Sequence, residues 1–220
     1  MPVRPHPIVV VGLAYLAGSV PFSNLMARRR AGVDLREVGT GTVSGSALQK
    51  VAGFGPLAVA GIAEVGKGAV GPLLAGSDRP VLAAVSGGAA VCGHNWSVFL
   101  RGAGGRGLSP AMGALLVRDW PGTATLLTGL ASGRLAKQTS VGCFAALMAL
   151  VPVLGRTRGG EGALAGAAVA APIFAKRLLG NRPPERRSAS VYLSRLVCDS
   201  DGWFGRAADG LSSVEPGDIR

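Results

Sequence analysis

The chain has 220 residues, a formal net charge of +11 and 48% apolar residues, but only 16% charged residues. Soluble domains average about 25% charged residues, so this composition argues against a soluble domain and favours an integral membrane protein. We expect no nucleic-acid partner, because the basic residues lie between apolar runs and only 5% of residues are aromatic. The three cysteines lack metal-ligand spacing, so we expect free thiols, no bound metal and no cofactor.

Seven apolar stretches are candidate membrane spans, because one crossing needs about 20 mostly apolar residues. In chain order they are Ile8–Ala27, Val51–Ala75, Pro80–Leu100, Leu108–Val117, Pro121–Gly133, Thr139–Leu154 and Ala163–Ala175. The first stretch is too long for a cleaved signal peptide, and three arginines follow it. The fourth and fifth stretches are short. If they formed a re-entrant pair, the chain would cross five times instead of seven.

Lysine and arginine are unevenly shared between the two sides that seven crossings create. With the N-terminus outside, most of them fall in the inner loops and in the C-terminal segment. The positive-inside rule therefore predicts a cytoplasmic C-terminus. We expect a transmembrane domain at residues 1–182 and a cytoplasmic tail at 183–220. That tail begins with a proline-containing linker at 183–187 and contains a short amphipathic helix at 191–197.

The end of the first stretch and the loop after it combine a hydroxyl group, an arginine and closely spaced glycines. These residues are Ser19, Pro21, Arg36, Gly39, Thr40 and Gly41. Glycines let backbone N–H groups approach a phosphate, and arginine offers a phosphate a planar fork. The segment is therefore a candidate anion pocket. A proline-kinked helix followed by a flexible loop is the alternative interpretation.

A second glycine-rich loop follows the third stretch and precedes the next helix. The residues of interest are His94, Asn95, Gly104, Gly105, Arg106 and Gly107. Backbone N–H groups at a helix N-terminus can bind a phosphate, and His and Asn side chains can stabilise an oxyanion or exchange a proton. The alternative is an interfacial His–Asn pair beside a tight turn.

Glu64 and Lys67 are ionisable residues inside the second apolar stretch. Their spacing allows them to pair on one helix face. Charged groups at membrane depth are costly and are functional candidates for that reason, although a neutralised structural pair is equally compatible with the pattern.

Four further polar positions are ordinary when taken alone. Ser140 opens the sixth stretch beside Lys137, as a helix N-cap does. Lys176 and Arg177, with Asn181 after them, close the seventh stretch as positively charged anchors do.

Taken together, these motifs resemble those of the bacterial acyl-phosphate:glycerol-3-phosphate acyltransferase family. The family patterns are GS-x-P-F with D-I-R-x-x-GSGN-x-GATN, then D-x-x-KG, then GHN-[FW]-x-x-F with GGKG, then R-Y-x-S-L-G-S. The matching residues are Gly18, Ser19, Pro21, Phe22, Asp34, Arg36, Gly39, Gly41, Glu64, Lys67, Gly68, Gly93–Trp96, Phe99, Gly104–Gly107, Lys137, Ser140, Gly142 and Cys143. The resemblance extends over roughly residues 8–180.

The chain departs from the family pattern at three places. Both asparagines of the first motif are absent from residues 39–47, and Arg106 replaces a lysine. The last family motif, R-H-x-x-N, has no clear match; Lys176-Arg177 with Asn181 is the nearest, and no histidine lies there.

The resemblance implies an all-α, polytopic protein of the bacterial inner membrane, with about seven helices and a cytoplasm-facing site. It implies transfer of a fatty acyl group from acyl phosphate to glycerol 3-phosphate, which gives lysophosphatidic acid and phosphate. Ser19, His94 and Asn95 would be catalytic. The substrate-binding residues would be Arg36, Gly39, Thr40, Gly41, Lys67, Gly104, Gly105, Arg106, Gly107, Ser140 and Asn181.

Two other functions remain open from the sequence. A catalytically impaired family member that binds lipid or a partner protein would account for the missing motif residues. A small-anion transporter is the third hypothesis, but transporters are often built from two related halves, and the sequence contains no such repeat.

Overall fold

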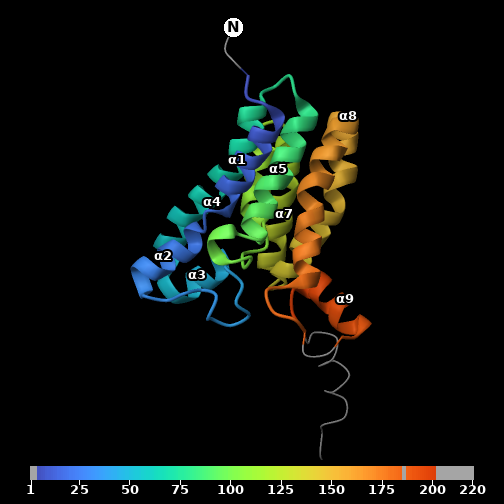
Figure 1. Ribbon diagram of the computed structural model, residues 1–220. Coiled ribbons are helices and arrows are strands. Elements are labelled where there is room, and N and C mark those ends of the chain that lie inside the picture. The colour runs from blue at the N-terminus through green and yellow to red at the C-terminus, as the bar shows by residue number, and fades with distance from the viewer. Residues whose placement is uncertain (1–3, 185–186, 202–220) are drawn as a thin grey trace, which may run out of the picture.

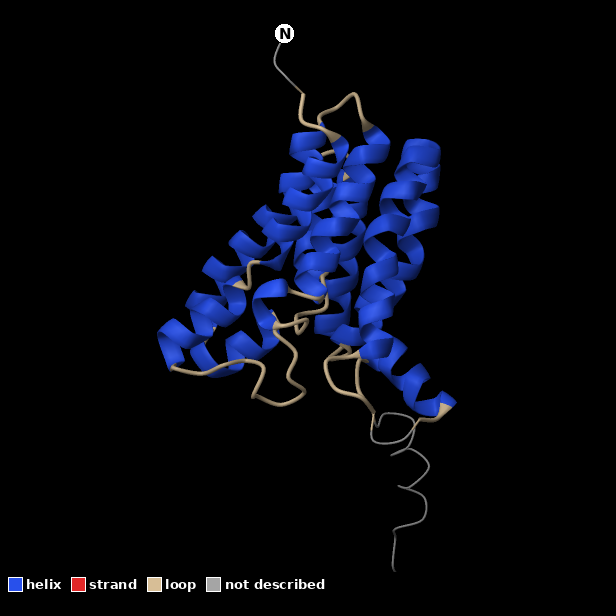
Figure 2. Ribbon diagram, in the orientation of Figure 1, coloured by secondary structure: helices blue, strands red, loops and turns tan. Residues whose placement is uncertain are grey.

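The computed structural model describes residues 4–184 and 187–201, and within these ranges its regular elements are all helical (Figures 1 and 2). The helices are α1 (Pro7–Ser19), α2 (Phe22–Ala31), α3 (Gly45–Ala52), α4 (Phe54–Ala75), α5 (Pro80–Asn95), α6 (Leu108–Leu116), α7 (Trp120–Leu135), α8 (Thr139–Leu179) and α9 (Ala189–Cys198), with a 3₁₀ turn η1 (Val98–Leu100). The all-α class is confirmed. Part of the predicted linker, 185–186, and the tail beyond residue 201 lie outside the described residues.

Three segments are long and apolar enough to cross a membrane by length and composition. They are Pro7–Ala31, Phe54–Ala75 and Thr139–Leu179. Large apolar side chains cover the outside of the bundle; Ile8 is 76% exposed and Ile62 is 77% exposed. Such a surface is unfavourable in water and suits contact with lipid chains.

The first predicted stretch lies within the candidate span Pro7–Ala31, but the helix in each of the first two stretches is interrupted. The helix ends before Val20 and a new helix begins at Phe22, because Pro21 has no backbone N–H to continue the helical hydrogen bonds. The second stretch begins in α3, which ends at Ala52. Gly53 has a φ of +82° and separates α3 from α4. A left-handed backbone of this kind favours glycine.

α8 is 41 residues long and folds back on itself. Gly159, with φ +68° and ψ −156°, interrupts the helix. A Cβ atom on Gly166 would lie 3.4 Å from the carbonyl oxygen of Leu150, so the second half runs back along the first (Figure 1). The sixth and seventh predicted stretches are therefore the two arms of one helical hairpin, and both are longer than predicted.

α1 and α5 pack at the distance that only small residues allow. A Cβ atom on Gly18 would lie 2.1 Å from the carbonyl oxygen of Ala90, and one on Gly93 would lie 2.1 Å from that of Tyr15. Membrane helices associate through such close backbone contacts, because the hydrophobic effect does not drive helices together in a solvent of lipid chains. This packing places the end of α1 directly beside the last turn of α5.

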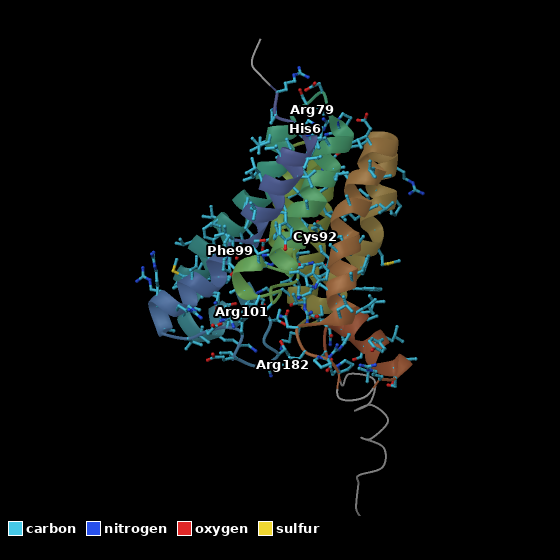
Figure 3. The ribbon with its side chains drawn as sticks, viewed as in Figure 1. His6, Arg79, Cys92, Phe99, Arg101 and Arg182 are labelled. Atoms are coloured by element: carbon cyan, nitrogen blue, oxygen red, sulfur yellow. The ribbon has the colours of Figure 1, made fainter. Side chains whose placement is uncertain are left out.

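The polar loops gather at one end of the bundle. Figure 3 shows His6 and Arg79 at the end where the N-terminus lies, and Arg101 and Arg182 at the opposite end. α2, α3 and α9 also lie at that opposite end (Figure 1). Segments that are distant in sequence therefore meet there. The third predicted stretch ends earlier than expected, because α5 stops at Asn95 and η1 turns toward the second glycine-rich loop.

Candidate functional site

Glu64 of α4 is the centre of a buried polar cluster. Its side chain is 4% exposed, and its Oε2 atom lies 2.6 Å from Nζ of Lys67 and 3.0 Å from Nδ1 of His94. Its Oε1 atom accepts hydrogen bonds of 3.1 Å from both the backbone N–H and the hydroxyl of Ser23. Three motifs that are far apart in the sequence therefore meet at one carboxylate.

Lys67 is held on three sides. Besides the ion pair with Glu64, its ammonium donates to the carbonyl of Val20 at 2.6 Å and lies 5.9 Å from the ring centroid of Phe22. The interruption before α2 makes these groups available, because Val20 and Phe22 flank the non-helical Pro21. The predicted pairing of Glu64 and Lys67 is confirmed. A buried ion pair is tolerated only when such additional hydrogen bonds satisfy it.

His94, in the last turn of α5, faces the second glycine-rich loop. Its backbone carbonyl accepts a 3.1 Å hydrogen bond from the N–H of Gly105. A Cβ atom on Gly105 would lie only 2.2 Å from Nε2 of His94. Glycine at 105 therefore leaves room for the imidazole edge that points away from Glu64.

Asn181, after α8, joins the two glycine-rich loops. Its Nδ2 group donates to the carbonyls of Gly41 at 2.9 Å and Gly104 at 2.8 Å, and its Oδ1 atom accepts from the N–H of Gly104 at 3.2 Å. The N–H groups of Gly104 and Gly105 thus already have acceptors in the protein. In the described part of the chain, those of Arg106 and Gly107 remain available for a ligand.

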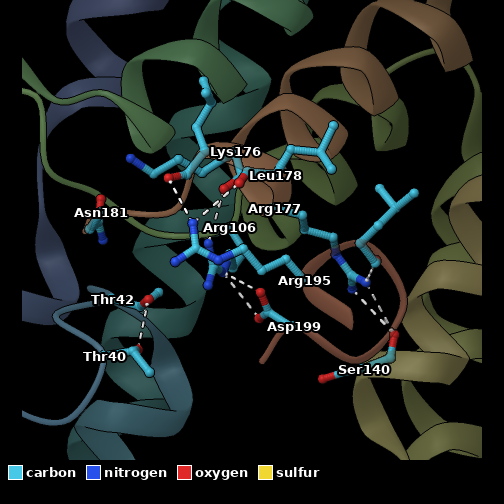
Figure 4. A network of polar contacts seen from close by, with 12 residues as sticks. Thr40, Thr42, Arg106, Ser140, Lys176, Arg177, Leu178, Asn181, Arg195 and Asp199 are labelled. Atoms are coloured by element: carbon cyan, nitrogen blue, oxygen red, sulfur yellow. Dashed lines mark hydrogen bonds and ion pairs between the residues drawn. The ribbon is translucent and has the colours of Figure 1, made fainter. Parts of the chain in front are cut away.

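Arg106 belongs to a second cluster, which consists of Arg106, Lys176, Arg177 and Asp199 (Figure 4). Nε of Arg106 lies 2.8 Å from the Asp199 carboxylate, and Nη1 donates to the carbonyl of Lys176 at 3.1 Å. The Lys176 ammonium lies 5.2 Å from the ring centroid of Trp96. Burial raises the pKa of Asp199 although Arg106 and Arg177 oppose the shift, so this carboxylate is held there at a desolvation cost.

α9 packs over this second cluster. Arg177 donates to the carbonyl of Leu196 in α9 at 2.8 Å and, at 3.4 Å, to the backbone carbonyl of Ser140. The Ser140 residue therefore meets the cluster through its backbone. The short helix predicted at 191–197 is confirmed as part of α9. Its last residue is followed by Asp199, which has a left-handed φ of 55°.

Arg36 lies at the rim of the candidate site and has a carboxylate partner of its own. Its Nη2 atom lies 2.7 Å from Asp34, which also pairs with Arg28. The Arg36 guanidinium holds the pKa of Asp34 well below its usual range. Thr40 bonds to Thr42 at 3.0 Å, and Arg182 donates to the carbonyls of Arg36 and Gly39 at 3.4 and 3.5 Å. The first glycine-rich loop is thereby tied to the segment after α8.

Ser19 and Asn95 are fully buried and flank the Glu64 cluster without bonding to it. The Ser19 hydroxyl donates to the carbonyl of Tyr15 at 2.9 Å, and its own carbonyl accepts from the Ser97 hydroxyl at 2.6 Å. Nδ2 of Asn95 donates to the carbonyl of Pro172 at 2.8 Å. Oδ1 of Asn95 is buried and has no hydrogen-bond partner among the described residues. A buried polar atom without a partner is uncommon and marks a place where a ligand group or water can bind.

The structure thus sorts the predicted residues into groups. His94 and Lys67 meet at Glu64, Gly41 and Gly104 meet at Asn181, Arg106 and Ser140 adjoin Lys176 and Arg177, and Arg36 stays with Asp34 at the rim. The sequence interpretation did not include Ser23 or Asp199. Ser23 lies one residue beyond the GS-x-P-F match, and no pattern connects Asp199 with the motifs.

A metal site and a cavity at the opposite end of the bundle are the two other candidates for a functional site, and the described residues support neither. Among the described residues, no group of three or more His, Cys, Asp or Glu side chains is placed to hold a metal ion. A cavity of about 670 Å³ lies at the opposite end, with a lining that includes Pro7, Ile8, Pro80 and Val85. Its one charged residue is Arg79, whose guanidinium already donates to three backbone carbonyls. The three cysteines are free thiols, as predicted.

Fold and site together define an integral membrane protein with a compensated ionic cluster and a basic, glycine-rich loop at one end of a helical bundle. The family model for glycerol-3-phosphate acyltransferase matches residues 8–178. The chain belongs to this glycerol-3-phosphate acyltransferase family.

Relatives from several bacteria carry the same description. A glycerol-3-phosphate acyltransferase of Synechococcus is 34% identical over 76% of this chain and 84% of its own length. Glycerol-3-phosphate acyltransferase 5 of Dehalococcoides mccartyi is 38% identical over 65% of this chain and 62% of its own length. A glycerol-3-phosphate acyltransferase of Thermus thermophilus is 44% identical over 49% of this chain and 54% of its own length. The chain therefore spans less than two thirds of the last two relatives.

Two solved structures share the fold. PlsY (YgiH), an integral membrane glycerol 3-phosphate acyltransferase, in its glycerol 3-phosphate form has a TM-score of 0.69 and 23% identity, over 85% of this chain and 98% of that one. The lysophosphatidic acid form has a TM-score of 0.67 and 20% identity. The fold is therefore that of a multi-pass integral membrane protein, as predicted from composition.

Proposed function

We propose that the protein transfers a fatty acyl group from acyl phosphate to the sn-1 hydroxyl of glycerol 3-phosphate, giving lysophosphatidic acid and inorganic phosphate. The observation that carries this proposal is the convergence of Ser23, Glu64, Lys67 and His94 beside the basic loop at Arg106. Glu64 and Lys67 come from one family motif, His94 comes from another, and Ser23 directly follows a third. Both substrates are phosphate anions that a basic site attracts.

The proposed site lies at the cytoplasmic face of the bacterial inner membrane. The proposal counts seven crossings, by α1, α4, α5, α6, α7 and the two arms of α8, with the N-terminus outside. This orientation is supported by the arginines of α2 and the loops at Arg101 and Arg182, which share one end of the bundle (Figure 3). The positive-inside rule assigns that end to the cytoplasm.

In this proposal, the second cluster and the glycine-rich loops bind phosphate. Arg106 and Lys176, with the N–H groups of Arg106 and Gly107, would hold one phosphate at the start of α6. Arg36 and the loop at 39–41 would close the rim, and Ser140 would lie beside Arg177. Asn181 would keep the two loops in register. The fatty chain would extend into the bilayer.

The chemistry is direct acyl transfer. His94 and Asn95 would orient the attacking hydroxyl and the acyl phosphate, with Ser19 fixing the end of α1 against α5. Since the hydroxyl of Ser19 already donates to Tyr15 and none of the described contacts joins it to His94, an acyl-serine intermediate is not part of the proposal.

A reconstituted assay with acyl phosphate and labelled glycerol 3-phosphate tests this function. We expect labelled lysophosphatidic acid and one phosphate released for each acyl group transferred. Absence of product above an empty-membrane control would refute it. The control for folding is that the reconstituted protein unfolds cooperatively and at the same temperature as before reconstitution.

A catalytically impaired family member is the second candidate function. It is favoured by one observation, the Asp199 carboxylate that already occupies Arg106. Complementation of a bacterial strain that lacks its own acyltransferase separates the two functions. Growth supports the enzyme, and failure to grow despite normal membrane expression supports the impaired member.

A further inference from the structure

We propose that α9 and the residue that follows it, Asp199, form an autoinhibitory latch. In the closed state, which the structure shows, the Asp199 carboxylate occupies Arg106; a phosphate group that binds Arg106 displaces this carboxylate and releases α9. The latch lies beyond the family-matched part of the chain, since that match ends at residue 178 and α9 begins at Ala189. The inference rests on the proposed function only for the kind of ligand, a phosphate group.

Asp199 pairs with Arg106 through a single N–H group (Figure 4). Nε of Arg106 donates to Oδ2 at 3.0 Å and lies 2.8 Å from Oδ1, which receives no hydrogen bond from the described residues. Nη1 donates to the carbonyl of Lys176 instead. The carboxylate therefore lacks the two parallel hydrogen bonds that make an arginine pair strong. A phosphate offers more acceptor oxygens and more negative charge, so it can displace this carboxylate.

The closed latch leaves polar groups of the second cluster without partners. Nε of Arg177 and Oγ of Ser200 are buried and have no hydrogen-bond partner among the described residues. Lys176 is 1% exposed, and its ammonium lies over the Trp96 ring without a carboxylate partner in the described part of the chain. Buried polar groups that stay unpaired carry a desolvation penalty. A phosphate bound in the cluster would supply acceptors that Asp199 does not.

Polar contacts, and little apolar burial, hold α9 in place. Arg195 donates to three backbone carbonyls at the end of α8 and just after it, at 3.2–3.3 Å. Arg177 donates to the carbonyl of Leu196 at 2.8 Å. The buried residues of α9 are Ser194 and Arg195, so none of its apolar side chains is fully buried. Contacts of this kind can be exchanged for contacts with water, which makes release of the helix feasible.

A latch of this kind changes the affinity for phosphate and leaves the chemical step alone. The apparent Kd equals the intrinsic Kd divided by the fraction of open molecules, so a latch closed in about half to nine-tenths of the molecules weakens binding about two- to tenfold. We therefore expect KM for glycerol 3-phosphate to contain this factor. The value of kcat, measured at saturation, should not contain it.

Hydrogen exchange of the full-length protein in lipid nanodiscs tests the release directly. We expect the amides of α9 to exchange faster with saturating inorganic phosphate, because a released helix of 10 residues is marginally stable in water. Sodium chloride at the same ionic strength is the control, because salt alone weakens ion pairs. Exchange in α9 that phosphate leaves unchanged or slows would overturn the proposal.

Arg195→Met opens the latch from outside the second cluster, because it removes the attachment of α9 and leaves Asp199 and Arg106 in place. We expect the Kd for inorganic phosphate, measured by calorimetry, and KM for glycerol 3-phosphate both to fall about two- to tenfold, with kcat changed less than about twofold. Arg187→Met is the matched control, since Arg187 is exposed just before α9, and it should change neither constant. An unchanged or weaker affinity for phosphate in Arg195→Met would contradict the latch and assign α9 a supporting role.

These measurements separate the latch from the proposed function, because calorimetry and hydrogen exchange need no turnover. A protein that is inactive toward acyl phosphate, but whose α9 is released by phosphate, would refute the acyltransferase function and leave the latch intact. An active protein whose α9 does not respond to phosphate would refute the latch and leave the acyltransferase function intact.

Discussion

The Glu64 cluster and the Arg106 cluster lie at the same end of the bundle, yet they balance charge in different ways. At Glu64, one carboxylate and one ammonium compensate each other, and both side chains are 4% exposed. The Arg106 cluster has three cations, Arg106, Lys176 and Arg177, and one carboxylate, Asp199, which comes from a segment beyond the family-matched residues 8–178. A closed ion pair fixes geometry, whereas a cluster with excess positive charge can accept an anionic ligand.

The largest effect should come from breaking the closed cluster. Glu64→Leu leaves Lys67 buried without its anion, and such a change typically costs about 3–5 kcal/mol. We expect a correspondingly large fall in the thermal unfolding midpoint in detergent. Glu161→Leu is the control, because Glu161 is 62% exposed and lies 3.7 Å from its partner Arg118.

A double variant sharpens the same prediction. Glu64→Leu combined with Lys67→Met replaces both charges by apolar groups and should recover much of the lost stability, because the unpaired charge is gone. If the double variant is as unstable as Glu64→Leu alone, the uncompensated Lys67 is not the cause of the instability.

Arg106→Ala tests the open cluster and should act chiefly on substrate binding, because Arg177 still compensates Asp199 when Arg106 is removed. A hydrogen bond to a charged group contributes about 1.5–3 kcal/mol, which corresponds to roughly a 10- to 150-fold loss in kcat/KM for glycerol 3-phosphate. Steady-state kinetics in vesicles would measure it. Arg118→Ala, at the other end of the bundle, is the matched control, and a change of less than twofold at Arg106 would remove this residue from phosphate binding.

Asp199→Asn should have a smaller effect in the opposite direction. The substitution removes the negative charge next to Arg106, and asparagine tolerates the left-handed φ of 55° at this position. Because a carboxylate no longer competes with phosphate, we expect KM for glycerol 3-phosphate to fall about two- to tenfold. Asp201→Asn, which alters the partner of Arg195, is the control on the same segment. A rise in KM would mean that Asp199 supports the site instead of competing for it.

The smallest effect should come from Asp34, which pairs with Arg36 at the rim of the candidate site. The pKa of Asp34 is lowered in the folded protein by Arg36 and Arg28, so the ionised form stabilises the fold at neutral pH. That contribution is complete above the ordinary value of about 3.9 and is lost as pH falls through the lower folded value. Asp34→Asn should therefore reduce the unfolding midpoint at pH 7 and have progressively less effect below about pH 4. An equal effect at both pH values would contradict the ion-pair explanation.

The sequence predicted the fold class and the approximate position of each apolar stretch, because a crossing demands about 20 apolar residues. It gave a proline kink only as the alternative interpretation of the motif that contains Pro21, and it did not place the interruption at Gly53. Proline and glycine are common inside membrane helices, so their presence does not reveal whether a helix bends or ends.

For the site, local spacing was sufficient at Glu64 and Lys67, which share one helix face. The contact between Glu64 and His94 depends on how α4 packs beside α5, and local sequence carries no such information. The link between Asp199 and Arg106 is more remote still in sequence, since it joins residues 93 positions apart.

The hydrogen bonds of Asn181 affect the entropy cost of binding a ligand at these loops. One amide side chain makes three hydrogen bonds, of 2.8, 2.9 and 3.2 Å, to loops that lie 77 and 140 residues away in the chain. The conformational entropy of ordering these glycine-rich loops is therefore lost during folding and not at the moment of ligand capture. Preorganisation of this kind lets more of the interaction energy appear as affinity.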